Sequence, residues 1–316
     1  MKVVKSNAVE SHAVKSNAVK SNTVEGNAAM TSRELEDGRP SRRDFLAGIG
    51  IAMAGAAALP AAVVASAEAF QQPKPGARGI PLFNGKDLSG FYTHLRGYGK
   101  NNDPKQVFSV QDGMLHISGE VNGGIINEQE HENFRLVAEY KWGAKMWPPR
   151  EKDAMDCGLL LHCGTEDAVA VGLWPQSIQF QIYQGAVGDL VLLPGKDVLT
   201  ATVEGEVRGS TFQYVPGVPA QVRQAGGTKR FEIIAHVDKD PEWKNVFGFR
   251  SKNDAERPHD EWNTIEAIAD GDTLTYIVNG KVVNKVTKSS LTRGRIGIQS
   301  ESGEIFFRRL ELFPLR

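Results

Sequence analysis

Short runs of alternating hydrophobic and polar residues recur along the chain from residue 106 onward, separated by Gly, Asn and Asp. A period of two is typical of strands with one buried face, and Gly, Asn and Asp between such runs favour tight turns. No long segment with helical periodicity interrupts the series. We therefore predict strands at residues 106–110, 114–118, 134–142, 158–163, 178–183, 230–238, 263–269, 273–278, 294–299 and 305–312.

Strands of this number and spacing predict an all-β sandwich or barrel. The abundance of glycine, with 33 residues, agrees with a fold that has many turns. We expect one domain over residues 79–316, preceded by a Pro- and Gln-containing linker over 68–78. We choose a two-sheet, concanavalin A-like jelly-roll β-sandwich, partly because of the family resemblance given below. Residues 185–214 are expected to be a long insertion that forms a loop beside the binding groove.

The segment 177–183 has the clearest division into two faces. Its hydrophobic side chains are Ile178, Phe180 and Ile182. Its polar face carries Ser177, Gln179, Gln181 and Tyr183. Side chains in register on one face of a strand can hydrogen-bond to the hydroxyls of a sugar, and the tyrosine adds an aromatic surface. An ordinary solvated outer face would have the same pattern.

The neighbouring segment 156–163 ends in a histidine. Alternation places Asp156, Gly158, Leu160 and His162 on one face. His162 would then lie at the loop edge, where a titratable imidazole could act as a base or a metal ligand. A structural histidine with satisfied hydrogen bonds is the alternative.

The N-terminal segment carries features of export. Residues 1–40 include a five-residue repeat that matches neither helix nor strand, and we predict that they are disordered. Arg42 and Arg43 precede an apolar run that ends near Ala67, so residues 41–67 resemble a twin-arginine signal peptide. A membrane anchor is the alternative, but Pro60 and the small residues at the cleavage site argue against it. We expect a periplasmic or secreted protein without a stable membrane anchor.

The charge balance bears on the expected partners, and the two cysteines bear on whether a disulfide can form. The chain has 37 basic and 38 acidic residues and no basic stripe with interleaved aromatics, so nucleic acid is not an expected partner. Cys157 and Cys163 would be about 20 Å apart along one extended strand. A disulfide needs Cα atoms within roughly 7 Å. We expect both to be small buried residues with free thiols, and a metal-binding pair or a reactive thiol is the alternative.

Short motifs, in the right order, resemble the 3-keto-disaccharide hydrolase domain family. They lie at residues 82–91, 110–115, 132–141, 174–182, 261–263 and in the closing strands up to 313–315. The resemblance extends over the whole predicted domain. It implies a concanavalin-like jelly roll and an enzyme that cleaves glycosides already oxidised at C3 of the sugar.

The implied reaction has definite requirements. A C3 ketone acidifies the C2 proton, so that a modest base can remove it. The enolate then expels the C1 substituent by β-elimination, and water adds to the resulting glucal. The enolate oxygen needs hydrogen-bond donors or a metal ion. The cofactor stays unknown, with a divalent metal ion as one candidate. The paired carboxylates of ordinary glycosidases are not needed.

The chain departs from the family pattern at three places. Gln179 stands where the family commonly has Glu, and a glutamine cannot act as a base. Asp156-Cys157-Gly158 replaces an Asn-Ser-Gly run, and residues 307–309 end in Arg where the family has Asn. Asp156, on a neighbouring strand, is a candidate for the missing carboxylate.

The resemblance and the predicted faces together give a set of expected site residues. The expected catalytic residues are His162, Glu139 and Glu261. The candidate metal ligands are His162, Asp156 and Glu261. The expected sugar-binding residues are Gln179, Gln181, Tyr183, Trp174, Trp262, Asn263 and Gln299.

The expected ligand is a small saccharide or glycoside. Because jelly rolls serve both catalysis and binding, a non-catalytic, lectin-like carbohydrate-binding module is the main alternative. Gln179 in place of Glu slightly favours that module. A structural or adhesive exported domain is a third reading.

Overall fold

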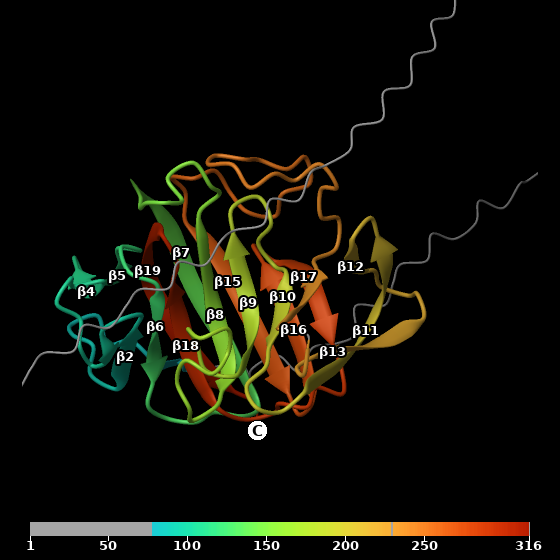
Figure 1. The fold of residues 1–316 in the computed structure, drawn as a ribbon, viewed down its shortest axis with the longest axis horizontal. Coiled ribbons are helices and arrows are strands. Elements are labelled where there is room, and N and C mark those ends of the chain that lie inside the picture. The colour runs from blue at the N-terminus through green and yellow to red at the C-terminus, as the bar shows by residue number, and fades with distance from the viewer. Residues whose placement is uncertain (1–77, 229, 316) are drawn as a thin grey trace, which may run out of the picture. The chain divides into compact units, whose positions relative to one another are not determined.

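The computed structural model describes residues 78–228 and 230–315, and every regular element in this part of the chain is a β-strand (Figure 1). The predicted leader and signal peptide, and nearly all of the linker, lie outside the described residues. Nineteen strands form two sheets. The fold class predicted from the sequence, an all-β jelly-roll sandwich, is confirmed.

The first sheet has eight strands. Its order is β17 (Lys281–Val286), β16 (Thr273–Val278), β15 (Asn263–Asp270), β7 (Phe134–Met146), β19 (Gly303–Pro314), β5 (Met114–Ile117) and β4 (Phe108–Gln111), with β1 (Ile80–Pro81) paired to β19.

The second sheet has eleven strands. Its order is β13 (Ala220–Ala225), β11 (Leu199–Arg208), β12 (Thr211–Tyr214), β14 (Glu232–Ala235), β10 (Leu190–Leu193), β9 (Ser177–Tyr183), β8 (Asp156–Cys163), β18 (Arg295–Ser300), β6 (Gly123–Asn127), β2 (Phe91–Leu95) and β3 (Gly99–Lys100).

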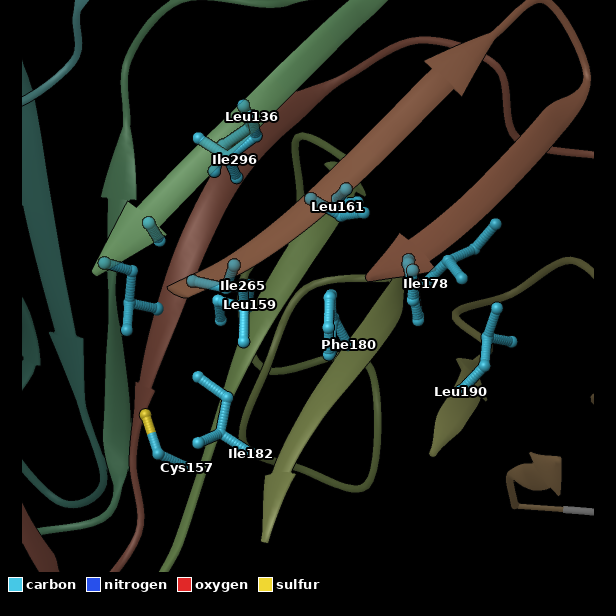
Figure 2. Packing of buried hydrophobic residues seen from close by; sticks show 14 of the residues in the cluster. Leu136, Cys157, Leu159, Leu161, Ile178, Phe180, Ile182, Leu190, Ile265 and Ile296 are labelled. Atoms are coloured by element: carbon cyan, nitrogen blue, oxygen red, sulfur yellow. The ribbon is translucent and has the colours of Figure 1, made fainter. Parts of the chain in front are cut away.

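The hydrophobic core lies between the two sheets. Figure 2 shows Leu159, Phe180 and Ile265 among the side chains that pack there, from strands of both sheets. Phe180 also stacks on Tyr276 of the first sheet, with ring centroids 4.2 Å apart. Burying a side chain of this size contributes about 1.5–3 kcal/mol. The hydrophobic side of β9 therefore faces the core, as its alternation predicts, and its glutamine side faces outward.

All ten predicted strands correspond to observed strands, but residues 185–214 were wrongly expected to be a loop. This segment contains β10, β11 and all of β12. In β10, Leu190 and Leu192 join the main core, whereas Val191 and Leu193 join a second hydrophobic cluster on the outer face. A strand that is buried on both faces has no alternation, so its pattern could not be distinguished from other apolar runs.

The remaining expectations about the domain concern its thiols and the membrane. Cys157 and Cys163 are buried and free, as predicted. Among the described residues, no helix is long and apolar enough to cross a membrane.

Candidate active site

A pocket of about 450 Å³ opens on the outer face of the eleven-stranded sheet, the face that points away from the core. Its floor is formed by β8, β9 and β10. Gln179, Gln181 and Tyr183 line it from β9, and Asp156 lines it from β8. Because β8 and β9 are antiparallel with Asp156 opposite Tyr183, the aspartate lies at the C-terminal end of the glutamine row.

Three glutamines, two on β9 and one on β18, form a hydrogen-bonded row across β8, called here the amide row. Gln179 and Gln299 exchange hydrogen bonds, with Nε2 to Oε1 distances of 2.9 and 3.3 Å. Gln179 Nε2 also donates to Gln181 Oε1, and Gln181 Nε2 donates to Asp156 Oδ1. The row is buried rather than solvated at Gln179 and Gln299. It therefore holds fixed amide groups and directs one of them at the Asp156 carboxylate.

Gly158 makes room for the amide row. A Cβ atom at this position would lie 2.5 Å from Gln299 Oε1 and 2.7 Å from Gln179 Nε2. Real Cβ atoms essentially never lie this close to another heavy atom. The absence of a side chain at Gly158 is thus what allows the amides of β9 and β18 to meet across β8.

Asp156 belongs to a second group, called here the carboxylate cluster, with Arg150 and Glu301. Arg150 Nη2 donates to Asp156 Oδ2 at 3.1 Å, and Arg150 Nη1 donates to Glu301 Oε1 at 3.2 Å. The side chains of Asp156 and Glu301 are only 8 % and 19 % exposed. Both line the pocket, so one guanidinium compensates one buried and one half-buried carboxylate at its wall.

Burial dominates the electrostatics of this cluster. It raises the pKa of Asp156 well above the ordinary value, and the charge of Glu301 raises it further, while Arg150 opposes the rise. Burial likewise raises the pKa of Glu301, against the lowering effects of Arg150 and Arg96. Carboxylates with raised pKa values in a pocket are candidates for proton transfer at neutral pH.

Aromatic and charged side chains surround the C-terminal end of β9. The rings of Tyr183 and Trp243 are 4.8 Å apart, and Lys239 Nζ lies 5.3 Å from the Trp243 ring centroid. Lys239 is paired with Asp189, which also accepts a hydrogen bond from His236 Nδ1 at 2.7 Å. Although burial raises the pKa of Asp189, Lys239 and His236 outweigh it and hold the pKa at about 2.

Trp243 belongs to the loop between β14 and β15, drawn in orange at the top of Figure 1. Glu256 fastens this loop to the core, because its carboxylate accepts hydrogen bonds from Trp142 Nε1 at 2.6 Å and Tyr140 Oη at 2.9 Å. Burial raises the pKa of Glu256 to about 7, helped by the nearby charge of Asp254. Trp243, at the other end of the loop, is held by its own hydrogen bond from Nε1 to the Gln184 carbonyl at 3.1 Å.

The 3-keto-alpha-glucoside-1,2-lyase-like domain family matches residues 78–312, which include every strand described except the last residues of β19. The chain belongs to this family. No curated protein matches the chain significantly.

Two solved structures are similar to this family member over most of their own length, at low identity. One is a Parabacteroides distasonis protein provisionally classed among the glycosyl hydrolases, at 14 % identity and a TM-score of 0.43, covering 74 % of this chain and 93 % of that one. Another is the β-glucanase of Bacillus licheniformis, at 10 % identity and a TM-score of 0.39, covering 75 % and 98 %. These similarities are too distant to indicate a ligand.

Several predicted site residues do meet at the pocket. Asp156, Gln179, Gln181, Tyr183 and Trp174 line it. Gln299 lies directly behind Gln179 in the amide row. The Trp174 indole Nε1 donates to the Gly123 carbonyl at 3.0 Å, so only its ring is available to a ligand.

His162 does not lie on this face, and the expectation that it shares a face with Asp156 is wrong. A register shift occurs where β8 pairs with β18, and His162 has a φ of 54°. This bulge reverses the alternation, so the imidazole is 1 % exposed and packs edge-on against Phe134 of the first sheet. Its Nδ1 lies 3.2 Å from the Leu291 carbonyl, and burial lowers its pKa to about 4.

Glu139 and Trp262 lie on the outer face of the first sheet, with the thickness of the sandwich between them and the pocket. Glu139 accepts a 2.6 Å hydrogen bond from Arg308, and the same guanidinium lies 4.3 Å from the Trp262 ring centroid. The alternation of β7 explains this placement, because Ala138 and Tyr140 point into the core. The expectation that these residues face the sugar groove is wrong.

Glu261 and Asn263 have other surroundings as well. Glu261 is an exposed loop residue that does not line the pocket. Asn263 is buried, and its Oδ1 accepts hydrogen bonds from the Arg257 amide at 2.7 Å and from Asn279 Nδ2 at 2.8 Å. Asn263 thus braces two loops and is not available to a sugar.

The candidate metal ligands are not brought together either. Of Asp156, His162 and Glu261, only Asp156 lines the pocket. Within the described part of the chain, no group of three or more His, Cys, Asp or Glu side chains has a metal-binding arrangement. The described residues therefore do not fit the divalent ion that the resemblance left open.

The residues missed by sequence reasoning come from loops and strand ends. Arg150 follows β7, Glu301 follows β18, and Trp243 lies in the loop before β15. None belongs to an alternating run. Their one shared signal is a charged or aromatic side chain next to a predicted strand end, which is too common to single them out.

Proposed function

We propose that this protein is an exported enzyme that cleaves 3-keto-glycosides by C2 proton abstraction and β-elimination, followed by hydration. The observation that carries the proposal is the carboxylate cluster, which places a buried carboxylate, a half-buried carboxylate and the arginine they share at the wall of a sugar-sized pocket. Family membership supports the class of substrate. The twin-arginine motif supports export.

Asp156 is the proposed base. Burial raises the pKa of Asp156 and makes it a stronger proton acceptor than an ordinary aspartate, while Arg150 opposes that rise. Gln181 donates a hydrogen bond to one carboxylate oxygen and Arg150 donates to the other. These two donors fix the orientation of the carboxylate toward a sugar bound on the amide row.

The enolate oxygen needs fixed positive charge or donors. Arg96 lines the pocket near Glu301, and its charge lowers the pKa of that carboxyl. The Tyr183 hydroxyl also lies at this end, and burial raises its pKa, so it remains a protonated donor. The proposed roles are stabilisation of the enolate by Arg96 and Tyr183 and binding of the remaining hydroxyls by the amide row.

The test is incubation of the mature protein with a 3-keto-glucoside in D₂O. Deuterium incorporation at C2 reports proton abstraction, and release of the aglycone reports elimination. We expect Asp156→Asn to lower both by about 10²- to 10⁴-fold. Glu139→Gln, a change on the outer face of the other sheet, is the matched control and should leave both rates unchanged. Equal rates for wild type and Asp156→Asn would refute the assignment of the base.

A non-catalytic carbohydrate-binding module is the second candidate. Gln179 favours it, because the amide row is uncharged where the family commonly carries a carboxylate, and amides with aromatic rings nearby suit sugar binding without chemistry. Calorimetric binding of glucosides by a protein that neither exchanges deuterium into a 3-keto-glucoside nor cleaves it would establish this reading instead.

A further inference from the structure

The pocket has two chemically different ends along the direction of β9. At the C-terminal end, the residues around Gln181 and Tyr183 are Asp156, Asp189, Glu301, Lys239 and Trp243. At the N-terminal end, Val191 lies opposite Gln179, and Leu193 lies opposite Ser177. Ser177 and Gln181 are four positions apart, which is about 13 Å of strand. The change from charged to apolar walls thus occurs within a single ligand length.

The apolar end continues over β14 and the loop before β9. Ile233 is paired with Val191, and it is 38 % exposed. Leu173 and Trp174 close the other side, packed with Val191 and Leu193 in the second hydrophobic cluster. Phe231 is also exposed at the mouth, beside the exposed Arg230. Large exposed hydrophobic side chains that gather at one end of a pocket indicate a surface that a ligand covers.

We propose that the substrate is a glycoside with an apolar aglycone, an aryl or alkyl group, which lies over Val191, Leu193 and Ile233 while the oxidised sugar lies against the carboxylate cluster. This inference rests on the proposed function for the identity of the sugar. It deepens that function by excluding a second hexose as the preferred leaving group.

The reason lies in the hydrogen-bonding capacity of the apolar end. A second hexose would bring several hydroxyl groups against Val191, Leu193 and Ile233, which cannot hydrogen-bond, and unpaired buried hydroxyls are costly. The Trp174 Nε1 donor is already used by the Gly123 carbonyl. Arg230 is exposed, so it offers a partner only at the mouth. An apolar aglycone removes water from these side chains without leaving a polar group unpaired.

The experiment compares ligands in two arms. In the binding arm, calorimetry measures phenyl glucoside, methyl glucoside and a glucose disaccharide, none of which carries a C3 ketone and none of which can undergo the elimination. In the turnover arm, the 3-keto forms of the same three compounds are compared by kcat/KM. We expect the phenyl compound to be favoured over both others by at least about tenfold in each arm.

Ile233→Gln is the diagnostic variant, because a partly exposed position tolerates a polar side chain. It should remove most of the preference for the phenyl compound and leave the affinity for methyl glucoside unchanged. Val222→Gln is the matched control, since Val222 is 66 % exposed on β13 and does not line the pocket. It should leave all three ligands unchanged.

The outcomes separate the two proposals. Turnover of all 3-keto compounds with no preference for phenyl, or with a preference for the disaccharide, overturns the aglycone site and leaves the proposed function standing. A phenyl preference in binding, abolished by Ile233→Gln, without any turnover supports the aglycone site while the proposed function fails. A wild-type dimer that Ile233→Gln dissociates would assign the apolar end to a second copy of the chain and overturn the inference.

Discussion

Arg150 is the side chain whose removal should perturb the site most clearly. It pairs with Asp153, Asp156 and Glu301 at distances of 3.1 to 3.2 Å. Arg150→Met keeps an unbranched stem of similar length and deletes the charge. We expect the variant to fold, to be less stable than wild type, and to lose more stability at pH 8 than at pH 5.

The size of the effect follows from burial. Breaking a buried ion pair from one side costs about 3–5 kcal/mol, because the remaining charge stays desolvated. Arg150 is 20 % exposed and Glu301 is 19 % exposed, so some water reaches the cluster and the lower end of the range applies. We expect a loss of about 3 kcal/mol at pH 8. For a domain of this size, that corresponds to roughly 6–12 °C in Tm.

The direction of the pH dependence follows from the raised pKa values of Asp156 and Glu301. A carboxyl group with a raised folded-state pKa stabilises the fold when protonated, below its ordinary pKa. That contribution is lost as the pH rises through the folded-state value. Without Arg150, both pKa values rise further, so the loss becomes larger and extends to higher pH. Near pH 4, where the carboxyl groups are largely protonated, the two proteins should differ least.

Urea unfolding followed by tryptophan fluorescence at pH 5 and pH 8 measures both quantities. Arg208→Met is the control, because the Arg208–Glu206 pair is 51 % exposed on both sides and should contribute at most about 1 kcal/mol. An equal loss in the two variants, or a loss in Arg150→Met that does not change with pH, would refute the claim that the carboxylates depend on the arginine.

Three further predictions test other parts of the site. Gly158→Ala should lower the free energy of unfolding by about 1–3 kcal/mol and weaken saccharide binding, because the added Cβ would collide with the amide row. Gly164→Ala is the control, since its Cβ would lie 3.7 Å from the nearest atom. The control should change neither urea unfolding nor calorimetric binding. In wild type, the stability that protonated Glu256 contributes is lost as the pH rises from 4.5 to about 7. The free energy of unfolding of Glu256→Gln should therefore change less between pH 5 and 8 than that of wild type. Parallel curves of unfolding free energy against pH would contradict the raised pKa of Glu256. Asn263→Ala should lose about 1–3 kcal/mol of stability with unchanged ligand affinity, and a selective loss of affinity would restore its sugar-binding role.

Local periodicity predicted the fold well because each sheet has a wet face and a dry face. In β9, the positions of Phe180 in the core and Gln179 at the pocket follow directly from alternation. Strands without one wet and one dry face show no such alternation and were not predicted. β10 is buried on both faces, and the short strands β2 and β6 have too few polar positions to show a period of two.

The site was less predictable because one of its charges arrives only through long-range pairing. Arg150 and Asp156 are six residues apart, in the loop after β7 and at the start of β8. Glu301 follows β18, 151 residues after Arg150, and the pairing of β8 with β18 brings it to the other two. The misplacement of His162 has a local cause that a period of two cannot reveal. One bulge with a left-handed residue reverses which face every later side chain occupies.

The position of the carboxylate ties the two ends of the pocket together. The resemblance places the family's usual Glu at Gln179, whereas the carboxylate here is Asp156, which is held by Gln181, two residues farther along β9. That difference moves the carboxylate by roughly 7 Å along the strand. A base must come within about 3 Å of the proton it removes, so the proposed sugar would have to bind closer to Tyr183 and Trp243. A sugar bound closer to Tyr183 and Trp243 leaves the space over Val191 to the leaving group. An apolar aglycone is therefore consistent with a base at Asp156.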